Sequence, residues 1–353
     1  MLKKLSKQKI SDIITYGIVL VAFIVMQILI NAGQISSLFE GLMVPLCTYI
    51  ILAISLNLVV GVLGELSLGH AGFMCVGAFT SAFFSKCMQD TITNSIVRFL
   101  IALLIGIVVA AIFGLLIGIP VLRLNGDYLA IVTLAFGEII KNIVNVLFIG
   151  KDSKGFHFST KDVMALNMEP DGKVIVNGPQ GITGAPKDAT FFIGFILVLI
   201  TLFIVLNLIH SRDGRAIMAI RDNRIAAESI GINITKYKLM TFTISAAMAG
   251  AAGVLYGHNL SNLTANTNNF GYNMSINILV FVVLGGIGNI RGSIISAVVL
   301  TFLPELLRGL SDYRMLIYAI VLIVMMLFNW APKAIEWREK YLSFKKNKKE
   351  AVK

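Results

Sequence analysis

The stretch FFIGFILVLITLFIVLNLIHSRDGRAIMAIRDNRIAAESIGINITKYKLMTFTISAAMAGAAGVLY (Phe191–Tyr256) contains two apolar runs on either side of a basic segment. A transmembrane helix needs about 20 predominantly apolar residues, and the runs Phe191–Ile209 and Leu239–Tyr256 are close to that length. The segment between them, His210–Lys238, carries six lysines and arginines. The stretch therefore predicts two membrane spans that are joined by an exposed, basic loop.

The loop His210–Lys238 is rich in residues that favour a helix. Asp213 can cap the start of that helix, and Gly231 can close its end in the left-handed conformation. Ile217 and Ile220 lie on one side of it. An exposed helix of this kind can dock in a groove of a partner protein, but the same pattern also fits an ordinary solvated helical hairpin.

Apolar residues make up 57% of the 353 positions, far more than in a soluble domain. Membrane-length runs recur along almost the whole chain, so the sequence predicts an all-α polytopic membrane protein with eight to ten transmembrane helices. The two shortest runs are separated by GNIRGS, which predicts a broken or re-entrant element there. The ten runs are Ile13–Ile30, Leu42–Val62, Leu66–Phe84, Phe99–Leu122, Tyr128–Ile149, Phe191–Ile209, Leu239–Tyr256, Ile276–Ile290, Ile294–Leu307 and Met315–Trp330.

Lysine and arginine are distributed unevenly between the two sides of this arrangement. With the N-terminus inside, the inner segments hold twenty of them and the outer segments nine, so the positive-inside rule predicts that both termini are cytoplasmic. The predicted organisation is an N-terminal segment 1–12, one transmembrane domain 13–330 and a basic cytoplasmic tail 331–353. Within that domain, 150–189 is an external loop and 210–238 a cytoplasmic one. The net charge of +11 is explained by this topology, without nucleic acid.

Polar residues at membrane depth are costly unless they are paired or functional. Glu138 and Lys141 lie three residues apart, so they share a helix face and can form an ion pair. We interpret the pair as part of the translocation pathway, of a subunit contact or of the helix-bundle interior. Glu65 and His70 lie at the inner end of the third run, where a histidine can line a gate or form a packing hydrogen bond. Asn57 in the second run fits the pathway or a bond between helices equally well.

Small residues form a strip along the seventh run. Ser245, Ala249, Gly253 and Gly257 follow one another at spacings of four and therefore lie on one helix face. Such a face lets helix backbones approach closely in lipid. The strip predicts close helix packing, with pore lining as the alternative.

Two glycine-rich segments interrupt the apolar pattern. VLGGIGNIRGS (Val283–Ser293) contains Gly285 and Gly286 and predicts either a re-entrant turn near the pathway or a tight inner loop. GPQGITGAP (Gly178–Pro186) precedes the sixth run on the outer side and is typical of a turn-rich segment that can serve as an external docking surface.

The sequence contains no motif for enzymatic chemistry. The patterns GxxxxGK[ST], HExxH, GxSxG and CxxC are all absent, and Cys47, Cys75 and Cys87 lack metal-ligand spacing. The chain is therefore predicted to be no enzyme and to bind no cofactor or metal. If ATP drives the protein, the nucleotide must bind another polypeptide.

Five segments make the chain resemble the branched-chain amino-acid permease family of bacterial ABC importers, and within it the LivM-like subunits. They occur in the order that the family shows, between about residues 45 and 310. The segments are LNLVVGVLGELSLGHAGFMCVGAF (Leu56–Phe79), GDYLAIVTLAFGEIIKNI (Gly126–Ile143), Gly178–Pro186, GRAIMAIRDNRIAAESIGINITKYKLMTFTISAAMAGAAGVLYG (Gly214–Gly257) and SINILVFVVLGGIGNIRGSIISAVVLTFLPELL (Ser275–Leu307).

The resemblance implies a function that the residues alone do not. Family members are multi-pass proteins of the bacterial cytoplasmic (plasma) membrane that pair with a homologous second permease, two cytoplasmic ATPase subunits that bind ATP and Mg²⁺, and an external substrate-binding protein. The implied substrate is leucine, isoleucine or valine, moved by alternating access, while similar permeases carry nucleosides, urea or sugars. AAESIG (Ala226–Gly231) corresponds to the core of the ATPase-coupling motif, in which Ile225 stands where a glutamate is usual. The coupling residues that the resemblance implies are Gly214, Arg215, Arg221, Arg224, Ala226, Ala227, Glu228 and Gly231.

An ion-coupled secondary transporter is a more remote alternative, and it requires an acidic residue along the pathway. Glu138 is the candidate, but Lys141 beside it favours the ionised carboxylate and so argues against proton carrying. An integral membrane enzyme lacks a recognisable nucleophile, metal site or acid–base set in this sequence.

Overall fold

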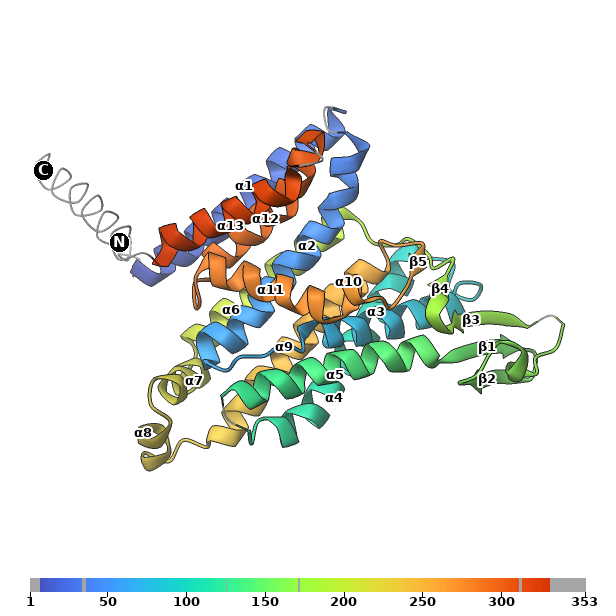
Figure 1. The fold of residues 1–353 in the computed structure, drawn as a ribbon, viewed down its shortest axis with the longest axis horizontal. Helices are drawn as coiled ribbons and strands as arrows, with labels where there is room; N and C mark the ends of the chain where they lie inside the picture. The colour runs from blue at the N-terminus through green and yellow to red at the C-terminus, as the bar shows by residue number, and fades with distance from the viewer. Residues whose placement is uncertain (1–6, 34–35, 125, 171, 311–312, 331–353) are drawn as a thin grey trace, which may run out of the picture.

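Long apolar runs form helices in a membrane protein because each backbone polar group must find its partner inside the chain. The computed structural model describes residues 7–33, 36–124, 126–170, 172–310 and 313–330, and this part of the chain is mostly helical (Figure 1). The helices are α1 (Lys7–Asn31), α2 (Ser37–Asn57) with its π-helical continuation η1 (Leu58–Leu63), α3 (His70–Cys87), α4 (Ser95–Val121), α5 (Asp127–Val146), α6 (Phe191–His210), α7 (Arg212–Asp222), α8 (Arg224–Ser229), α9 (Ile234–Gly257), α10 (Thr267–Phe270), α11 (Tyr272–Gly285), α12 (Ile290–Leu306) and α13 (Arg314–Trp330).

Within the described residues, seven helical segments are long and apolar enough to cross a membrane. They fall on seven of the ten predicted runs, and the remaining three runs form the helices α3, α11 and α13. The seven segments are Asp12–Asn31, Ser37–Leu63, Ser95–Val121, Asp127–Val146, Phe191–His210, Ile234–Gly257 and Ile290–Gly309. The predicted tail 331–353 and the first six residues of the N-terminal segment 1–12 lie outside the described residues.

Several predicted boundaries were wrong, and three of them show why. The third run begins at His70 and not at Leu66, because the residues from Gly64 to Gly69 are not helical. The fifth helix ends at Val146, since strand β1 begins two residues later. The eighth helix is shifted toward the N-terminus and spans Tyr272–Gly285.

The described chain is mostly helical, as predicted, but it is not all-α, because the segment predicted to be an external loop contains strands. The strands β1 (Phe148–Asp152), β2 (Gly155–Ser159) and β3 (Lys173–Asn177) form an antiparallel sheet in the order β2-β1-β3. β4 (Ile182–Thr183) pairs with β5 (Asn262–Leu263), so the predicted turn-rich segment Gly178–Pro186 is tied to the residues that follow α9.

The side chain of Asp152 holds the β1–β2 hairpin together. Its carboxylate accepts hydrogen bonds from the backbone N–H groups of Lys154 and Gly155, at 2.9 and 3.1 Å, and lies 2.9 Å from His157 Nε2. Burial raises the pKa of Asp152, but hydrogen bonds from the Glu169 and Lys154 backbones and from the His157 side chain outweigh it and hold that pKa below its usual value. The charged carboxylate therefore fixes the turn between the two strands.

Helices α3, α4 and α9 form the tightest part of the bundle, because glycines remove the side chains between them. A Cβ atom on Gly77 of α3 would lie 2.2 Å from the carbonyl oxygen of Gly250 of α9. A Cβ on Gly253 would lie 2.0 Å from the carbonyl oxygen of Met74, and one on Gly106 of α4 only 2.3 Å from the Val254 side chain. The three backbones are thus in direct contact, as small residues allow in membrane helices.

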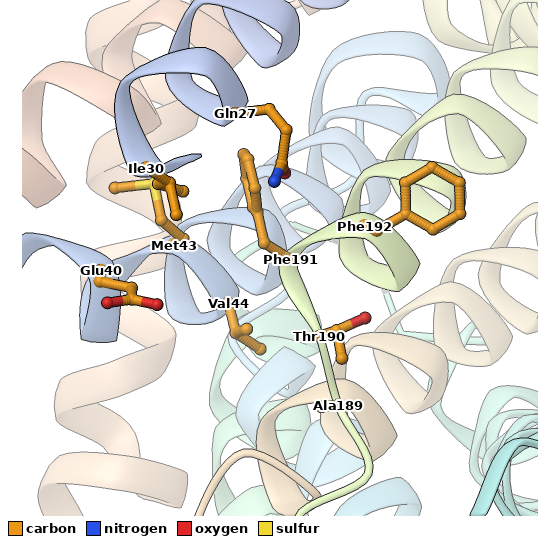
Figure 2. A pocket seen from close by; sticks show the side chains of 9 residues that line it. All are labelled: Gln27, Ile30, Glu40, Met43, Val44, Ala189, Thr190, Phe191 and Phe192. Carbon is orange, nitrogen blue, oxygen red and sulfur yellow. The ribbon is translucent and has the colours of Figure 1, made fainter. Parts of the chain in front are cut away.

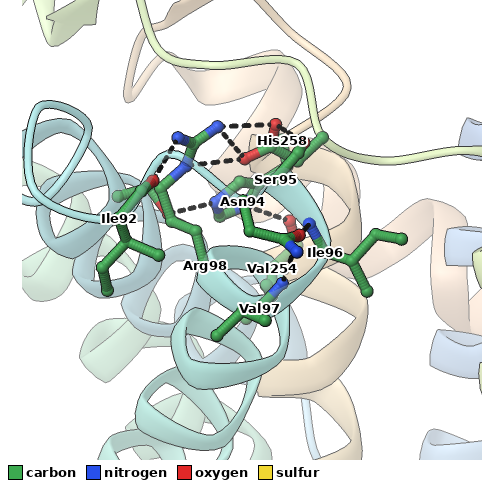
Figure 3. A network of polar contacts seen from close by, with 10 residues as sticks. Ile92, Asn94, Ser95, Ile96, Val97, Arg98, Val254 and His258 are labelled. Atoms are coloured by element: carbon green, nitrogen blue, oxygen red, sulfur yellow. Dashed lines mark hydrogen bonds and ion pairs between the residues drawn. The ribbon is translucent and has the colours of Figure 1, made fainter.

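A buried ion pair joins the start of α4 to the segment before α6 (Figure 3). The Arg98 guanidinium donates to both carboxylate oxygens of Asp188, at 2.8–3.0 Å, and to the carbonyl of Ile92 at 3.1 Å. The two side chains are only 8% and 5% exposed. Nearby, His258 Nε2 lies 2.8 Å from Ser85 Oγ, so α3 and α9 are linked at the same end of the bundle.

The two ends of the molecule differ in character. Figure 1 shows the α7–α8 pair at the lower left and the β1–β3 sheet at the right. His210 Nδ1 lies 3.5 Å from the Asp12 carboxylate, so the start of α1 belongs to the same end as α7. We refer to these as the α7–α8 end and the sheet end.

Candidate functional site

The basic loop forms two helices and not the single helix that the sequence predicts. Ser211, not Asp213, caps α7, because its hydroxyl accepts the N–H of Gly214 at 3.0 Å. Asn223 has an extended backbone that ends α7, and its side chain caps α8 by accepting from the N–H of Ala226 at 3.0 Å. Gly231 follows α8 with φ +85°, which is the left-handed conformation expected of it.

One side of the α7–α8 pair is buried against the bundle. Gly214, Ile217 and Ile220 of α7 are buried, and a Cβ on Gly214 would lie 2.1 Å from the carbonyl oxygen of Leu208. Ala227 of α8 packs with Ile220 in a small separate cluster. Two of the predicted coupling residues, Gly214 and Ala227, thus serve contacts within the chain.

The other side of the pair is open. Ile225 and Ile230 are 80% and 75% exposed, although both are large apolar residues. The remaining predicted coupling residues, which are also exposed, are Arg215, Arg221, Arg224, Ala226, Glu228 and Gly231. Of these, Arg215 donates to the carbonyl of His210 at 3.3 Å. Ile225 and Ile230 thus leave two large apolar side chains uncovered among charged residues.

Arg221 reaches from α7 into the bundle. Its Nη1 donates to the carbonyl oxygen of Gly61 at 2.9 Å, inside the π-helical turn η1. Its Cγ lies 2.5 Å from where a Cβ of Gly64 would be, and Gly64 has φ +82°. Only glycine meets both requirements at position 64, since a side chain there would be strained and would displace Arg221.

The contact continues from η1 to the turn between α11 and α12. The Asn57 amide donates to Ser293 Oγ at 2.7 Å, and its carbonyl oxygen accepts the N–H of Gly288 at 2.9 Å. A Cβ on Gly61 would lie 2.4 Å from the nitrogen of Gly288. We call Asn57, Gly61, Gly64, Arg221 and Gly288 the coupling junction, because they connect α7 to this turn without a gap.

The predicted interruption GNIRGS begins in a tight turn between α11 and α12 and continues into the first residues of α12. The turn runs from Gly286 to Asn289, and the Asn289 side chain caps α12 by accepting the N–H of Gly292 at 3.3 Å. Gly285, the last residue of α11, packs directly on the backbone of Gly292. Gly285 and Gly286 thus lie next to the coupling junction.

Glu65, in the non-helical segment before α3, and His70, the first residue of α3, both contact α9. Glu65 forms an ion pair with Lys238 of α9 at the α7–α8 end, and the lysine is almost fully buried. His70 Nε2 lies 2.7 Å from Ser245 Oγ, and that hydroxyl donates to the carbonyl of Ser55 at 2.6 Å. The other members of the small-residue strip, Ala249, Gly253 and Gly257, are buried along α9.

Glu138 and Lys141 form an ion pair that anchors a broken helix. The Glu138 carboxylate also accepts the N–H of Tyr272 at 2.8 Å and so caps α11, while Lys141 Nζ donates to Thr267 of α10 at 3.3 Å. A Cβ on Gly271, between α10 and α11, would lie 3.0 Å from the Glu138 carboxylate. The pair holds the break between the two helices at mid-length of α5.

Replacing Glu138 by glutamine should lower stability moderately. The amide oxygen can still accept the N–H of Tyr272, but the charge that pairs with Lys141 is lost, at a cost of about 1.5–3 kcal/mol for a hydrogen bond to a charged group. The measurement is the thermal unfolding midpoint of the purified protein in detergent. The double variant Glu138→Gln with Lys141→Met leaves no unpaired charge, so its unfolding midpoint should lie closer to that of the wild type. A midpoint below that of the single variant would contradict this account.

Several contacts could not be expected from the sequence. Gly61, Gly64 and Ser293 lie in segments that the sequence analysis quoted, but they carry no charge, and nothing in those segments predicts their partners. Asp188 lies in a polar loop, where a carboxylate is common and does not predict a buried ion pair. The run NTNNFGYN (Asn266–Asn273) is the one indication in the sequence of the polar contacts at α10 and α11, because so many amides are unusual beside a membrane span.

Two cavities lie outside this region. One of about 360 Å³ opens between α1, α2 and the start of α6 (Figure 2), and one of about 490 Å³ lies between α3, α4, α5 and the sheet. The first is lined by Gln27, Ile30, Glu40, Met43, Val44, Ala189, Thr190, Phe191 and Phe192. The second has an almost wholly apolar wall. In the described part of the chain, no group of three or more histidine, cysteine or acidic residues is placed to hold a metal ion.

Comparisons with known proteins agree on one family. Residues 37–328 match the family described as the permease component of branched-chain amino acid transport systems. The chain is 35% identical over 296 residues to the high-affinity branched-chain amino acid transport system permease protein LivM of Salmonella typhimurium, covering 81% of this chain and 67% of the relative. It is 26% identical to LivH of the same organism, over 72% and 79% of the two chains. It is 25% identical to the fructose import permease protein FruG of Bifidobacterium longum, over 94% of both. No solved structure matches the chain.

Proposed function

The chain belongs to the family of permease components of branched-chain amino acid transport systems, and from that premise we propose that it is the membrane subunit of an ATP-driven ABC importer for leucine, isoleucine and valine. The proposal covers a bacterial cytoplasmic membrane location and a homologous second permease, as the pair of LivM and LivH relatives suggests. It also covers two ATPase subunits, which bind ATP and Mg²⁺, and an external substrate-binding protein.

In this proposal the α7–α8 end is cytoplasmic and the sheet end is external. The excess of lysine and arginine on the α7–α8 side supports that orientation. The contact of Asp12 with His210 supports placing the N-terminus on the same side. With α3, α11 and α13 added to the seven long segments, the chain crosses the membrane ten times, and the C-terminus is cytoplasmic as well.

The observation that carries the proposal is the contact of Arg221 with Gly61. An ATPase that docks on the exposed Ile225 and Ile230 pushes α7–α8 as a unit, because the two helices share the cluster around Ile220. The guanidinium transmits that displacement to η1, and Asn57 transmits it to the turn at Gly288. Movement at the cytoplasmic face thereby reaches α2, α11 and α12 together. Such a joint movement of membrane helices is what alternating access requires.

Secondary transport is a weaker account of the same structure. A proton-carrying carboxylate must be free to take up and release its proton, whereas Glu138 is engaged by Lys141 and by the N–H of Tyr272.

Uptake of labelled leucine by cells with and without this gene tests the proposal. Deletion should abolish saturable uptake, excess unlabelled isoleucine should compete, and excess fructose or nucleoside should not. Uptake should persist when the proton gradient is collapsed while ATP is kept high. Leucine uptake that survives the deletion would overturn the substrate, and competition by fructose would favour the function of the FruG relative.

A further inference from the structure

The break between α10 and α11 exposes a set of amides beside α5, one of the seven helical segments long and apolar enough to cross a membrane. Asn268 and Asn277 are exposed, and Asn273 donates to the Asn268 side chain at 3.1 Å. Tyr272, which begins α11, is exposed as well. Because Asn273 and Asn277 are four residues apart, they lie on the same face of α11.

Helix α5 continues this polar face. Glu138 and Lys141 bind the residues on both sides of the break, and the Asn145 amide donates to the carbonyl of Ala265 at 2.8 Å. Asn142 is exposed and lies one turn from Glu138, so the two side chains project from the same side of α5. We call Asn142, Asn268, Tyr272, Asn273 and Asn277 the amide face.

Helix α4 shows what a lipid-facing surface of this chain looks like. Between Ile96 and Ile119 every exposed residue of α4 is apolar, and Leu104, Val108 and Ile112 are among them. An amide that is moved into hydrocarbon without a partner costs several kcal/mol, roughly 4–8 on a cyclohexane scale. The amide face is therefore a poor lipid-facing surface, since Asn142 and Asn277 would place such groups in hydrocarbon.

We infer that the amide face lines the water-filled route by which substrate passes this subunit. Amides offer donors and acceptors without net charge, and the adjacent Glu138–Lys141 pair places opposite charges side by side. Ile139 and Ile276 are exposed next to these groups. The combination suits a small zwitterion with an aliphatic side chain, and this choice of substrate class rests on the proposed function, whereas the placing of the route does not.

Accessibility of introduced cysteines tests this inference. The complete transporter is reconstituted in nanodiscs, with Cys47, Cys75 and Cys87 replaced by alanine, and single cysteines are placed by Asn142→Cys, Asn268→Cys and Asn277→Cys. The matched controls are Val108→Cys and Ile112→Cys, on the apolar face of α4. A charged, water-soluble thiol reagent reacts only with the thiolate, so cysteines in hydrocarbon should react at least about tenfold more slowly.

The expected result is rapid labelling at the three asparagine positions, slow labelling at the two α4 positions and a change of rate at the former when ATP is trapped on the ATPases. Labelling as slow at all three asparagine positions as on α4 would overturn the inference and mark the amide face as a dry contact between subunits. Equal labelling of the α4 controls would also overturn it. Rapid labelling that saturating leucine does not slow, but fructose does, would support the route and contradict the proposed substrate.

Discussion

Transport is expected to fall to background in the Arg221→Glu variant, although the protein should still fold and reach the membrane. The substitution removes the donor to the Gly61 carbonyl oxygen and places a carboxylate against that oxygen. A hydrogen bond from a charged group contributes about 1.5–3 kcal/mol, and here it is the direct polar link from α7 to η1. Uptake of labelled leucine measures transport, and ATP hydrolysis by the assembled complex shows whether the ATPase subunits are still active.

The matched control for this experiment is Lys236→Glu. Lys236 is also exposed near the α7–α8 end, and its substitution changes the net charge equally, but its ammonium group lies over the ring of Tyr237 in α9. We expect Lys236→Glu to retain most of its uptake and Arg221→Lys to retain part of it, because a lysine can still donate to Gly61. Wild-type uptake by Arg221→Glu would remove the coupling role of this contact.

The Asp188→Ala variant should lose about 3–5 kcal/mol of stability, which is typical when one partner of a buried ion pair is removed. Arg98 would remain buried with only the Ile92 carbonyl as an acceptor, and Ser95 would lose the carboxylate that its hydroxyl binds at 2.5 Å. The thermal midpoint of the purified protein in detergent should fall sharply, with little folded protein recovered.

The double variant Arg98→Met with Asp188→Leu separates charge from packing. Because no charge is then left buried, most of the lost stability should return, as it does when other buried ion pairs are replaced by apolar residues. If Asp188→Ala melts with the wild type, the pair contributes nothing measurable. If the double variant melts as low as the single one, the loss is due to packing and not to charge.

The sequence predicted the ten long apolar helices well, because each of them coincides with a local run of apolar residues, whereas the polar helix α10 was missed. The Glu138–Lys141 contact followed from a spacing of three residues, and the left-handed Gly231 followed from its place after a helical pattern. The sheet was missed because β1 and β2 are short and contain lysine, aspartate and serine, so they look like an ordinary polar loop.

Contacts between distant parts of the chain could not be predicted in this way. Asn57 was singled out as a polar residue in a span, yet its partners Gly288 and Ser293 lie more than 230 residues further along. The choice of Asp213 as a helix cap failed for a smaller reason. Ser211 lies two residues earlier and can serve as well, so a local pattern could not decide between them.

The π-helical turn Leu58–Leu63 gives the chain spare length where α2 meets the coupling junction. A π-helix closes hydrogen bonds between residues five apart and an α-helix between residues four apart, so the turn holds one residue in reserve. If η1 rewinds as α-helix, the segment beyond Gly64 turns by about 100° around the helix axis and moves by about 1.5 Å along it. A small displacement at the coupling junction would then rotate the segment beyond Gly64 by a large angle. The hydrogen bonds within α2, from Ser37 to Asn57, would be kept.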